Sequence, residues 1–277
     1  MSKVMSLKSR IKSYAQRKSL TAQVVLQNYM FECFLNRLSK SKYCDNFIVK
    51  GGLLISALVG LDTRATMDLD TTLRYRVLSE KVLEELINEI CSLDLDDGVN
   101  FRIVSFSRIR DNDVYGGFCV RVDALYETII TPLSIDVTTG DVITPDPVRY
   151  EFTGLFDHNI KIPLWGYNVE TVLAEKVETI LSRGIFSTRP RDFYDIYILS
   201  AARTFSIITF RQALDATTKH RNSKKVIDDC EKIIQSISDS PVLNNEWKKY
   251  QEKFDYAKEI TFEETIVALR ELMKRNE

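Results

Sequence analysis

The sequence lacks any apolar run close to the roughly 20 residues that a membrane-spanning helix needs. Its first residues lead into a basic stretch instead of the apolar core of a signal peptide. Histidine is scarce as well, since His158 and His220 are the only two and have no partner at ligand spacing, which argues against a zinc site. These absences predict a cytoplasmic protein that does not use a membrane.

Cysteine pairs and common nucleotide motifs are also missing. The five cysteines are an odd number without a Cys-x-x-Cys pair, so we expect reduced, mostly structural thiols. The chain has no Gly-x-x-x-x-Gly-Lys-Ser/Thr loop, no Gly-x-Gly-x-x-Gly fingerprint and no Gly-x-Ser-x-Gly elbow. The usual P-loop, dinucleotide-binding and hydrolase sites are therefore poorly supported.

Charge is balanced overall but uneven along the chain. The 277 residues are 44% hydrophobic and 28% charged with a net charge of -1, which predicts a globular chain of one large domain or two moderate ones. Residues 1–42 carry nine Lys or Arg against the single acidic residue Glu32. The sequence favours a solvated helix face there, with a contact surface for a phosphate backbone as the alternative.

The stretch 47–72 combines glycines and carboxylates in one compact segment. A lone Gly-Gly or Asp-x-Asp is a weak signal, so their order and distance carry the argument. The predicted elements are a buried strand at 47–49, a turn at Gly51 and Gly52, a helix at 53–61 and a strand at 67–73.

This segment predicts a nucleotidyl-transfer site. Asp68 and Asp70 alternate with Leu69, so in a strand both carboxylates project to one face, where they can hold Mg²⁺. Gly51 and Gly52 let the backbone approach a phosphate, and the following helix offers its free N–H groups. An enzyme that grips a triphosphate and aligns it with metal ions needs both features.

A third carboxylate, Asp136, lies in the predicted strand 133–138. It alternates with Ile135 and Val137, so it can join the metal site. An equally good interpretation from the residues alone is a strand-end aspartate that caps the turn at 138–141.

The remaining pattern predicts an α+β fold in two parts. Period-two segments at 101–106 and 118–124 predict an antiparallel hairpin joined through 111–117, and a helix capped by Ser79 precedes them. We predict a mixed sheet with flanking and N-terminal helices at 1–163, and a helical domain at 164–277. Ser19 is the expected N-cap of the second helix, and residues 145–163 are expected to be irregular. The helices predicted beyond them are 169–182, 193–202, 209–217, 225–237, 245–254 and 261–274.

A basic cluster follows in the helical part. Lys176 can form ion pairs within its own helix, or can clamp a triphosphate together with Arg189 and Arg191. Asp192 and Asp195 can cap a helix or hold a basic partner, and capping alone explains Asp192 because it opens the predicted helix.

Taken together, these motifs resemble the AbiEii/AbiGii toxin family of DNA polymerase β-like nucleotidyltransferases over about 47–199. The resemblance rests on three segments: Val49-Lys50-Gly51-Gly52-Leu53-Leu54, Thr63-Arg64-Ala65-Thr66-Met67-Asp68-Leu69-Asp70, and Leu173-Ala174-Glu175-Lys176 through Thr188-Arg189-Pro190-Arg191-Asp192-Phe193-Tyr194-Asp195.

The resemblance implies a bacterial toxin of a toxin–antitoxin or abortive phage infection system. Such a toxin transfers a nucleotide from an NTP to an acceptor, with tRNA suggested by relatives, and has a cognate antitoxin that in some systems acts without contact. The implied residues are Asp68, Asp70, Lys176 and Asp192 for catalysis, Asp68, Asp70 and Asp136 for Mg²⁺, and Lys50, Gly51, Gly52, Arg64, Lys176, Arg189 and Arg191 for the nucleotide.

Two alternatives remain open at this point. The first is a regulator that binds NTP without catalysis and acts through protein contacts. The second is a metal-dependent nuclease, which would shorten RNA without added NTP.

Overall fold

A computed structural model describes residues 3–109, 116–202 and 205–274. The chain forms two compact units. The first unit comprises Met1–Asp141 and Pro147–Gly166; the second comprises Val142–Asp146 and Tyr167–Glu277. Most of the predicted hairpin connection at 111–117 lies outside the described residues.

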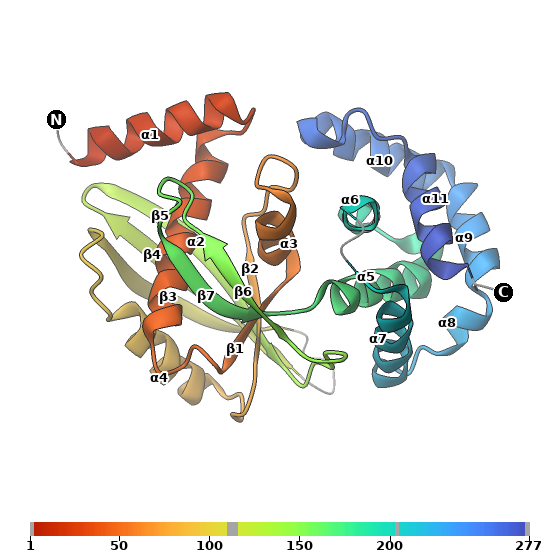
Figure 1. Cartoon of the computed structure of the whole chain (residues 1–277), viewed down its shortest axis with the longest axis horizontal. Helices are drawn as coiled ribbons and strands as arrows, with labels where there is room; N and C mark the ends of the chain where they lie inside the picture. The colour runs from red at the N-terminus through yellow and green to blue at the C-terminus, as the bar shows by residue number, and fades with distance from the viewer. Residues whose placement is uncertain (1–2, 110–115, 203–204, 275–277) are drawn as a thin grey trace. The chain divides into compact units, whose positions relative to one another are not determined.

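The first unit is built on a seven-stranded mixed sheet (Figure 1). The strand order is β3-β4-β5-β2-β1-β7-β6, so the segments predicted to carry the glycines and aspartates are central strands. The strands are β1 (Phe47–Lys50), β2 (Leu69–Leu73), β3 (Val99–Ile109), β4 (Gly117–Tyr126), β5 (Ile129–Thr139), β6 (Val148–Thr153) and β7 (Lys161–Gly166).

Pairing directions follow from the connections. The predicted β3–β4 hairpin is confirmed as an antiparallel pair, and β5 continues the meander. Strand β2 pairs antiparallel with β1 but parallel with β5, and β1 pairs parallel with β7. The α+β class predicted from the change in period is confirmed.

Among the described residues of this unit, the helices that accompany the sheet are α1 (Lys3–Arg17), α2 (Ala22–Lys40), α3 (Gly51–Val59) and α4 (Glu80–Cys91). Ser79 caps α4 as predicted, because its side chain accepts a hydrogen bond from the Val82 N–H. The predicted cap of α2 is wrong. Ser19 has a φ of 52° within the turn that ends α1, and Thr21 caps α2 instead by accepting from the Val24 N–H.

The Lys and Arg side chains of α1 are exposed, which agrees with both interpretations of this basic stretch. Only Leu7, Ile11 and Ala15 of this helix are buried. Arg37 of α2, in contrast, is buried. It is 1% exposed and donates to both carboxylate oxygens of Asp97 at 2.7 and 2.8 Å. A buried cation is tolerated there because its hydrogen-bond donors are satisfied.

The interpretation of residues 145–163 as irregular is wrong, because β6 and the first half of β7 fall within them. Proline was the misleading signal, since its missing N–H normally excludes it from inner strands. Pro163 pairs with Glu151 of β6, whereas the pairing of β7 with β1 involves only Trp165 and Gly166. Pro163 therefore occupies a position at which β1 requires no donor.

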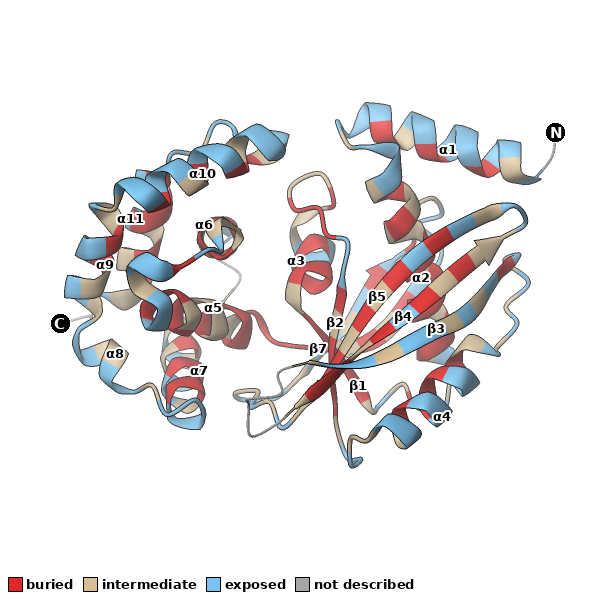
Figure 2. Ribbon diagram, turned by 180° about the vertical axis from the view of Figure 1, so that it is seen from behind, coloured by how far each residue is buried: buried red, intermediate tan, exposed pale blue. Residues whose placement is uncertain are grey.

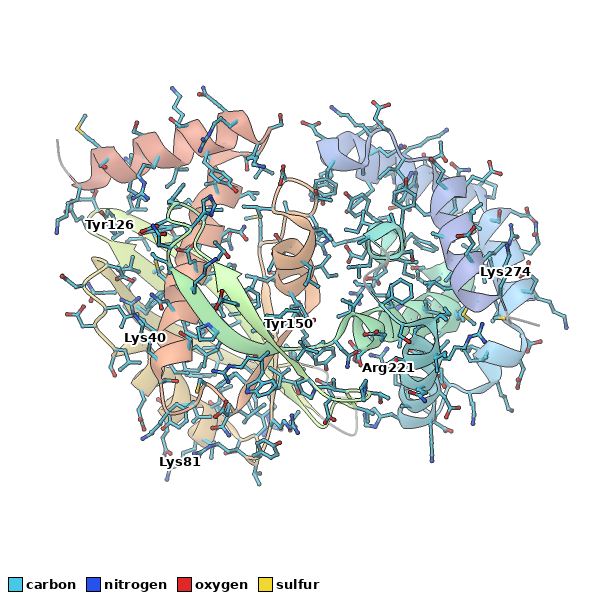
Figure 3. All side chains as sticks on the ribbon, in the orientation of Figure 1. Lys40, Lys81, Tyr126, Tyr150, Arg221 and Lys274 are labelled. Atoms are coloured by element: carbon cyan, nitrogen blue, oxygen red, sulfur yellow. The ribbon has the colours of Figure 1, made fainter. Side chains whose placement is uncertain are left out.

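The second unit is helical, as the sequence predicted. Figure 2 shows that α5 is largely buried along its length. In Figure 3 the labelled Arg221, at the end of α7, pairs with Glu175 and Glu178 of α5. The elements are α5 (Val169–Arg183), η1 (Gly184–Phe186), α6 (Pro190–Ala202), α7 (Ile207–His220), α8 (Lys225–Asp228), α9 (Cys230–Ser238), α10 (Pro241–Lys253), η2 (Asp255–Ala257) and α11 (Phe262–Met273).

The helix predicted at 225–237 is in fact two helices, α8 and α9, that meet at Asp229. All five cysteines are free thiols, in agreement with the sequence. Within the described ranges, none of the helices has the length and apolar character required to span a bilayer.

Candidate active site

The predicted glycine turn lies directly against the aspartate strand. Gly51 is the first residue of α3, so the helix begins earlier than predicted, and its φ of 66° lies in the left-handed region. A Cβ added at Gly51 would lie 1.9 Å from Oδ2 of Asp70. The β1–β2 register, which sets Lys50 opposite Asp70, produces this approach. Glycine is required here both by backbone conformation and by the space that Asp70 occupies.

We expect Gly51→Ala to destabilise the protein and to displace the Asp70 carboxylate. The positive φ alone costs an L-residue about 1–2 kcal/mol, and the overlap with Asp70 adds to that cost. Thermal unfolding measures the stability. Gly98→Ala is the matched control, because Gly98 also has a positive φ (74°) but faces the Tyr126 ring. An equal stability loss in both variants would contradict the contact with Asp70.

Two of the predicted metal carboxylates are neighbours. Asp70 and Asp136 are direct partners in the parallel β2–β5 register, so their side chains share a face of the sheet. Asp136 lies inside β5, three residues before its end, and the strand-end alternative is therefore wrong. Among the described residues Asp70 makes no ion pair, so a lysine or arginine does not neutralise it there.

Asp68 is placed differently from the expectation. Strand β2 begins at Leu69, which leaves Asp68 exposed just ahead of it, so strand alternation does not fix the direction of this side chain. Within the part of the chain that the structure describes, three His, Cys, Asp or Glu side chains do not gather in a metal-binding group. The close pair is thus Asp70 with Asp136.

Gly52 faces the loop that leads to β2. A Cβ at this position would lie 2.7 Å from Oγ1 of Thr66 and 3.1 Å from a guanidinium nitrogen of Arg64. Arg64 is 2% exposed and donates to the Ala65 carbonyl at 2.6 Å. Thr66 was not among the site residues predicted from the sequence, although its place two residues before Asp68 could have pointed to it.

Lys50 is buried in the sheet. Its ammonium donates to Oγ1 of Thr138 at 2.7 Å and to Oδ2 of Asp141 at 2.6 Å. Burial opposes ionisation of Asp141, but the charge and hydrogen bonds of Lys50 outweigh it and lower the pKa of that carboxyl. The structure thus assigns Lys50 an ion pair with Asp141 at the end of β1.

The N-terminus of α3 retains its capacity for an anion. Lys50 stands at the N-cap position and forms no side-chain cap hydrogen bond. The first N–H groups of a helix have no partner within that helix and carry the positive end of its dipole. A phosphate can therefore bind at Gly51 and Gly52 through backbone donors.

In the second unit, Lys176 of α5 joins two aspartates of α6. Its Nζ lies 2.7 Å from Asp192 and 2.7 Å from Asp195, whose side chains are 3% and 0% exposed. Arg189 also contacts Asp192, at 2.8 Å. Of the two interpretations of Asp192, helix capping is wrong, because α6 begins at Pro190. The other, that it holds a basic partner, is confirmed, because its carboxylate accepts from Lys176.

The two predicted arginines have different surroundings. Arg189 is half-exposed beside Asp192, whereas Arg191 lies 5.4 Å over the centroid of the Phe254 ring. A cation over an aromatic face is held electrostatically. A contact of Arg189 or Arg191 with the nucleotide remains a prediction.

We expect Lys176→Met to lower the free energy of unfolding by about 3–5 kcal/mol, since it leaves buried carboxylates without their shared cation. Thermal or chemical unfolding measures the loss. Lys249→Met supplies the control: Lys249 pairs with Glu246 on the surface, where such pairs contribute little. A loss below 1 kcal/mol at Lys176 would contradict the structural role of this ion pair.

The model of the nucleotidyl transferase AbiEii toxin family, of type IV toxin–antitoxin systems, matches residues 33–268. The chain belongs to the AbiEii family. The resemblance seen in the motifs is thereby confirmed, and with it nucleotidyl transfer as the activity of this family.

Solved structures agree on the fold of this AbiEii member. A putative nucleotidyltransferase from H. pylori matches with a TM-score of 0.51 and 16% identity, over 92% of this chain and 94% of that one. The structure of JHP933 from Helicobacter pylori matches equally, with a TM-score of 0.51, 16% identity, and 92% and 91% coverage. No curated protein sequence matches the chain.

Proposed function

We propose that this AbiEii toxin transfers a nucleotide from an NTP to an RNA acceptor, with tRNA as the favoured acceptor and Mg²⁺ as the cofactor. One observation supports the proposal most: Asp70 lies beside Asp136 and directly against Gly51. Carboxylates for a metal ion and backbone donors for a phosphate thus occupy one place in the sheet.

The residues fit a magnesium ion. Mg²⁺ prefers oxygen ligands and is commonly held by one or two carboxylates, with substrate phosphates and water completing its shell. Asp70 and Asp136 supply two neighbouring carboxylates, and two such groups repel each other unless a cation or proton intervenes. Asp68 is proposed as a further ligand, from its place next to β2.

The reaction then divides among the residues of the first unit. When bound, the metal ion supplies charge stabilisation to the oxygens around the α-phosphate. Gly51 and Gly52 bind the polyphosphate through their N–H groups and hold it in line with an acceptor hydroxyl. The hydroxyl of Thr66, next to Gly52, is proposed to orient the same phosphate.

Other assignments rest on the family resemblance. Lys176 and Asp192 are kept as proposed functional residues, with Arg189, Arg191, Arg64 and Lys50 as proposed nucleotide contacts. The exposed basic face of α1 supports an RNA acceptor. Family membership implies a cognate antitoxin, and we propose a role in phage defence inside the cytoplasm.

A transfer assay tests the function. Purified protein is incubated with total tRNA, Mg²⁺ and each labelled NTP in turn, and the RNA is separated on a denaturing gel. Label that enters RNA only with Mg²⁺ supports the proposal.

The rival functions give other results in the same assay. NTP binding without transfer to any acceptor would favour the non-catalytic regulator. RNA shortened in the absence of NTP would identify a nuclease. Either result would overturn nucleotidyl transfer to RNA.

A further inference from the structure

A cavity of about 280 Å³ lies in the first unit beside α3. Its wall is mostly apolar, and its described lining takes in α3 from Leu53 onward without Gly51 or Gly52. This volume suits a ring system the size of one nucleobase, near the lower end of small-molecule sites. Its apolar lining includes Leu35, Leu53, Leu54, Leu61 and Ile162.

Two carboxylates line this cavity, that of Glu151 on β6, which is exposed, and that of Glu32 on α2, which is partly buried. Oε2 of Glu32 accepts a hydrogen bond from the Leu155 N–H at 2.6 Å, and among the described residues Glu32 forms no ion pair. Burial raises the pKa of Glu32 to about 7, against the opposing effects of Leu155 and Arg10. A desolvated carboxylate with spare acceptor sites favours a ligand that brings N–H donors.

A second cavity, of about 550 Å³, adjoins the first and has the opposite charge. Arg10 and Arg17 of α1 line it together with Ser9 and Ser13. Arg10 lies 4.7 Å over the Phe156 ring, and within the described ranges neither arginine pairs with a carboxylate. Guanidinium groups and hydroxyls are the usual side-chain partners of a phosphate.

The two cavities share three lining residues: Tyr14, Leu155 and His158. Tyr14 offers an aromatic face at the junction, and such faces stack on nucleobases. Tyr150 of β6, which is labelled in Figure 3, also lines the first cavity. One molecule with a hydrogen-bonding ring at one end and a phosphate at the other matches this arrangement.

We propose that the first unit holds a second nucleotide site, specific for a guanine nucleotide, with the base at Glu32 and the phosphate at Arg10 and Arg17. Guanine presents two adjacent donors, N1–H and the 2-amino group, on its Watson–Crick edge, and a carboxylate accepts both. Adenine has a single donor group on that edge. Uracil has carbonyl acceptors on both sides of its N–H, and a carboxylate repels those carbonyl oxygens.

Binding of guanosine 5′-monophosphate (GMP) tests the site without any transfer reaction. Isothermal titration calorimetry is run at pH 8 with EDTA, so that metal-dependent binding at Asp70 does not contribute. We expect a Kd below about 1 mM for GMP, with adenosine 5′-monophosphate (AMP) at least about tenfold weaker. Glu32→Gln removes the charge-assisted hydrogen bonds and is expected to weaken GMP about tenfold or more.

Two further variants locate the ligand. Arg10→Ala changes an exposed side chain, so the fold is expected to persist while GMP binding weakens and loses salt dependence. Asp70→Asn is the control and is expected to leave GMP binding unchanged. Four results would each overturn the proposal. They are equal affinity for GMP and AMP, no effect of Glu32→Gln and Arg10→Ala, loss of binding in Asp70→Asn, and no binding at GMP concentrations up to about 10 mM. A failed transfer assay would not affect it.

Discussion

Asp70→Asn is expected to lower the rate of nucleotide incorporation into RNA by about 10³-fold, with little change in stability. The amide keeps the size of the side chain but loses the charge that the proposed Mg²⁺ site beside Asp136 requires. A metal ion stabilises a phosphoryl transition state by several kcal/mol, and each 1.36 kcal/mol is about tenfold in rate. Initial rates with labelled NTP at saturating Mg²⁺ measure the effect.

The matched control is Asp123→Asn, which lies on β4 of the same sheet and pairs with Arg102 at 2.6 Å. This variant is expected to keep the wild-type rate. An Asp70→Asn protein that remains folded and incorporates nucleotide within tenfold of wild type would remove Asp70 from the chemistry.

Glu32→Gln is expected to stabilise the protein at pH 8 by about 3 kcal/mol relative to its effect at pH 4. Burial raises the pKa of Glu32 from its ordinary value of 4.5 to about 7 in the fold. A raised carboxyl pKa favours the protonated form in the fold, so this contribution is present below pH 4.5 and is lost as pH rises through 7. A difference of about 2.5 pKa units corresponds to about 3 kcal/mol.

Urea unfolding of both proteins at pH 4, 6 and 8 measures this difference, because glutamine stays neutral throughout. Charged neighbours of Glu32, namely Arg10, Asp157, Glu151 and His158, are the same in both proteins and cancel in the comparison. Glu85→Gln, on the exposed face of α4, is the control. A stability difference that does not change with pH would show that Glu32 is ionised as readily in the fold as in the unfolded chain.

The sequence predicted the central part of the fold because local signals there agree with one another. Period-two patterns marked β3 and β4, Ser79 marked the start of α4, and the glycine pair marked the junction of β1 and α3. The close approach of Asp70 to Gly51 also followed from order and distance, since a short connection forces β2 to return beside β1.

The parts that failed depend on partners distant in the chain. Proline content hid β6 and β7, because the sheet happens to require no donor at Pro163. The residues next to Asp192 favour a helix cap, whereas its actual partner, Lys176, lies 16 residues away. The pairing of Lys50 with Asp141 spans 91 residues, and no local pattern encodes it.

The path of the chain has a consequence for dissecting the protein. Residues 142–146 leave the first unit, join the second and return at Pro147. There the amide of Asn168 donates to the carbonyls of Thr144 and Asp146, both at 2.9 Å. A fragment cut after Gly166 would keep residues 142–146 but would lack Asn168, whose amide donates to two of their carbonyls. Expression of either half alone therefore calls for a redesigned linker across 142–146 rather than a simple truncation.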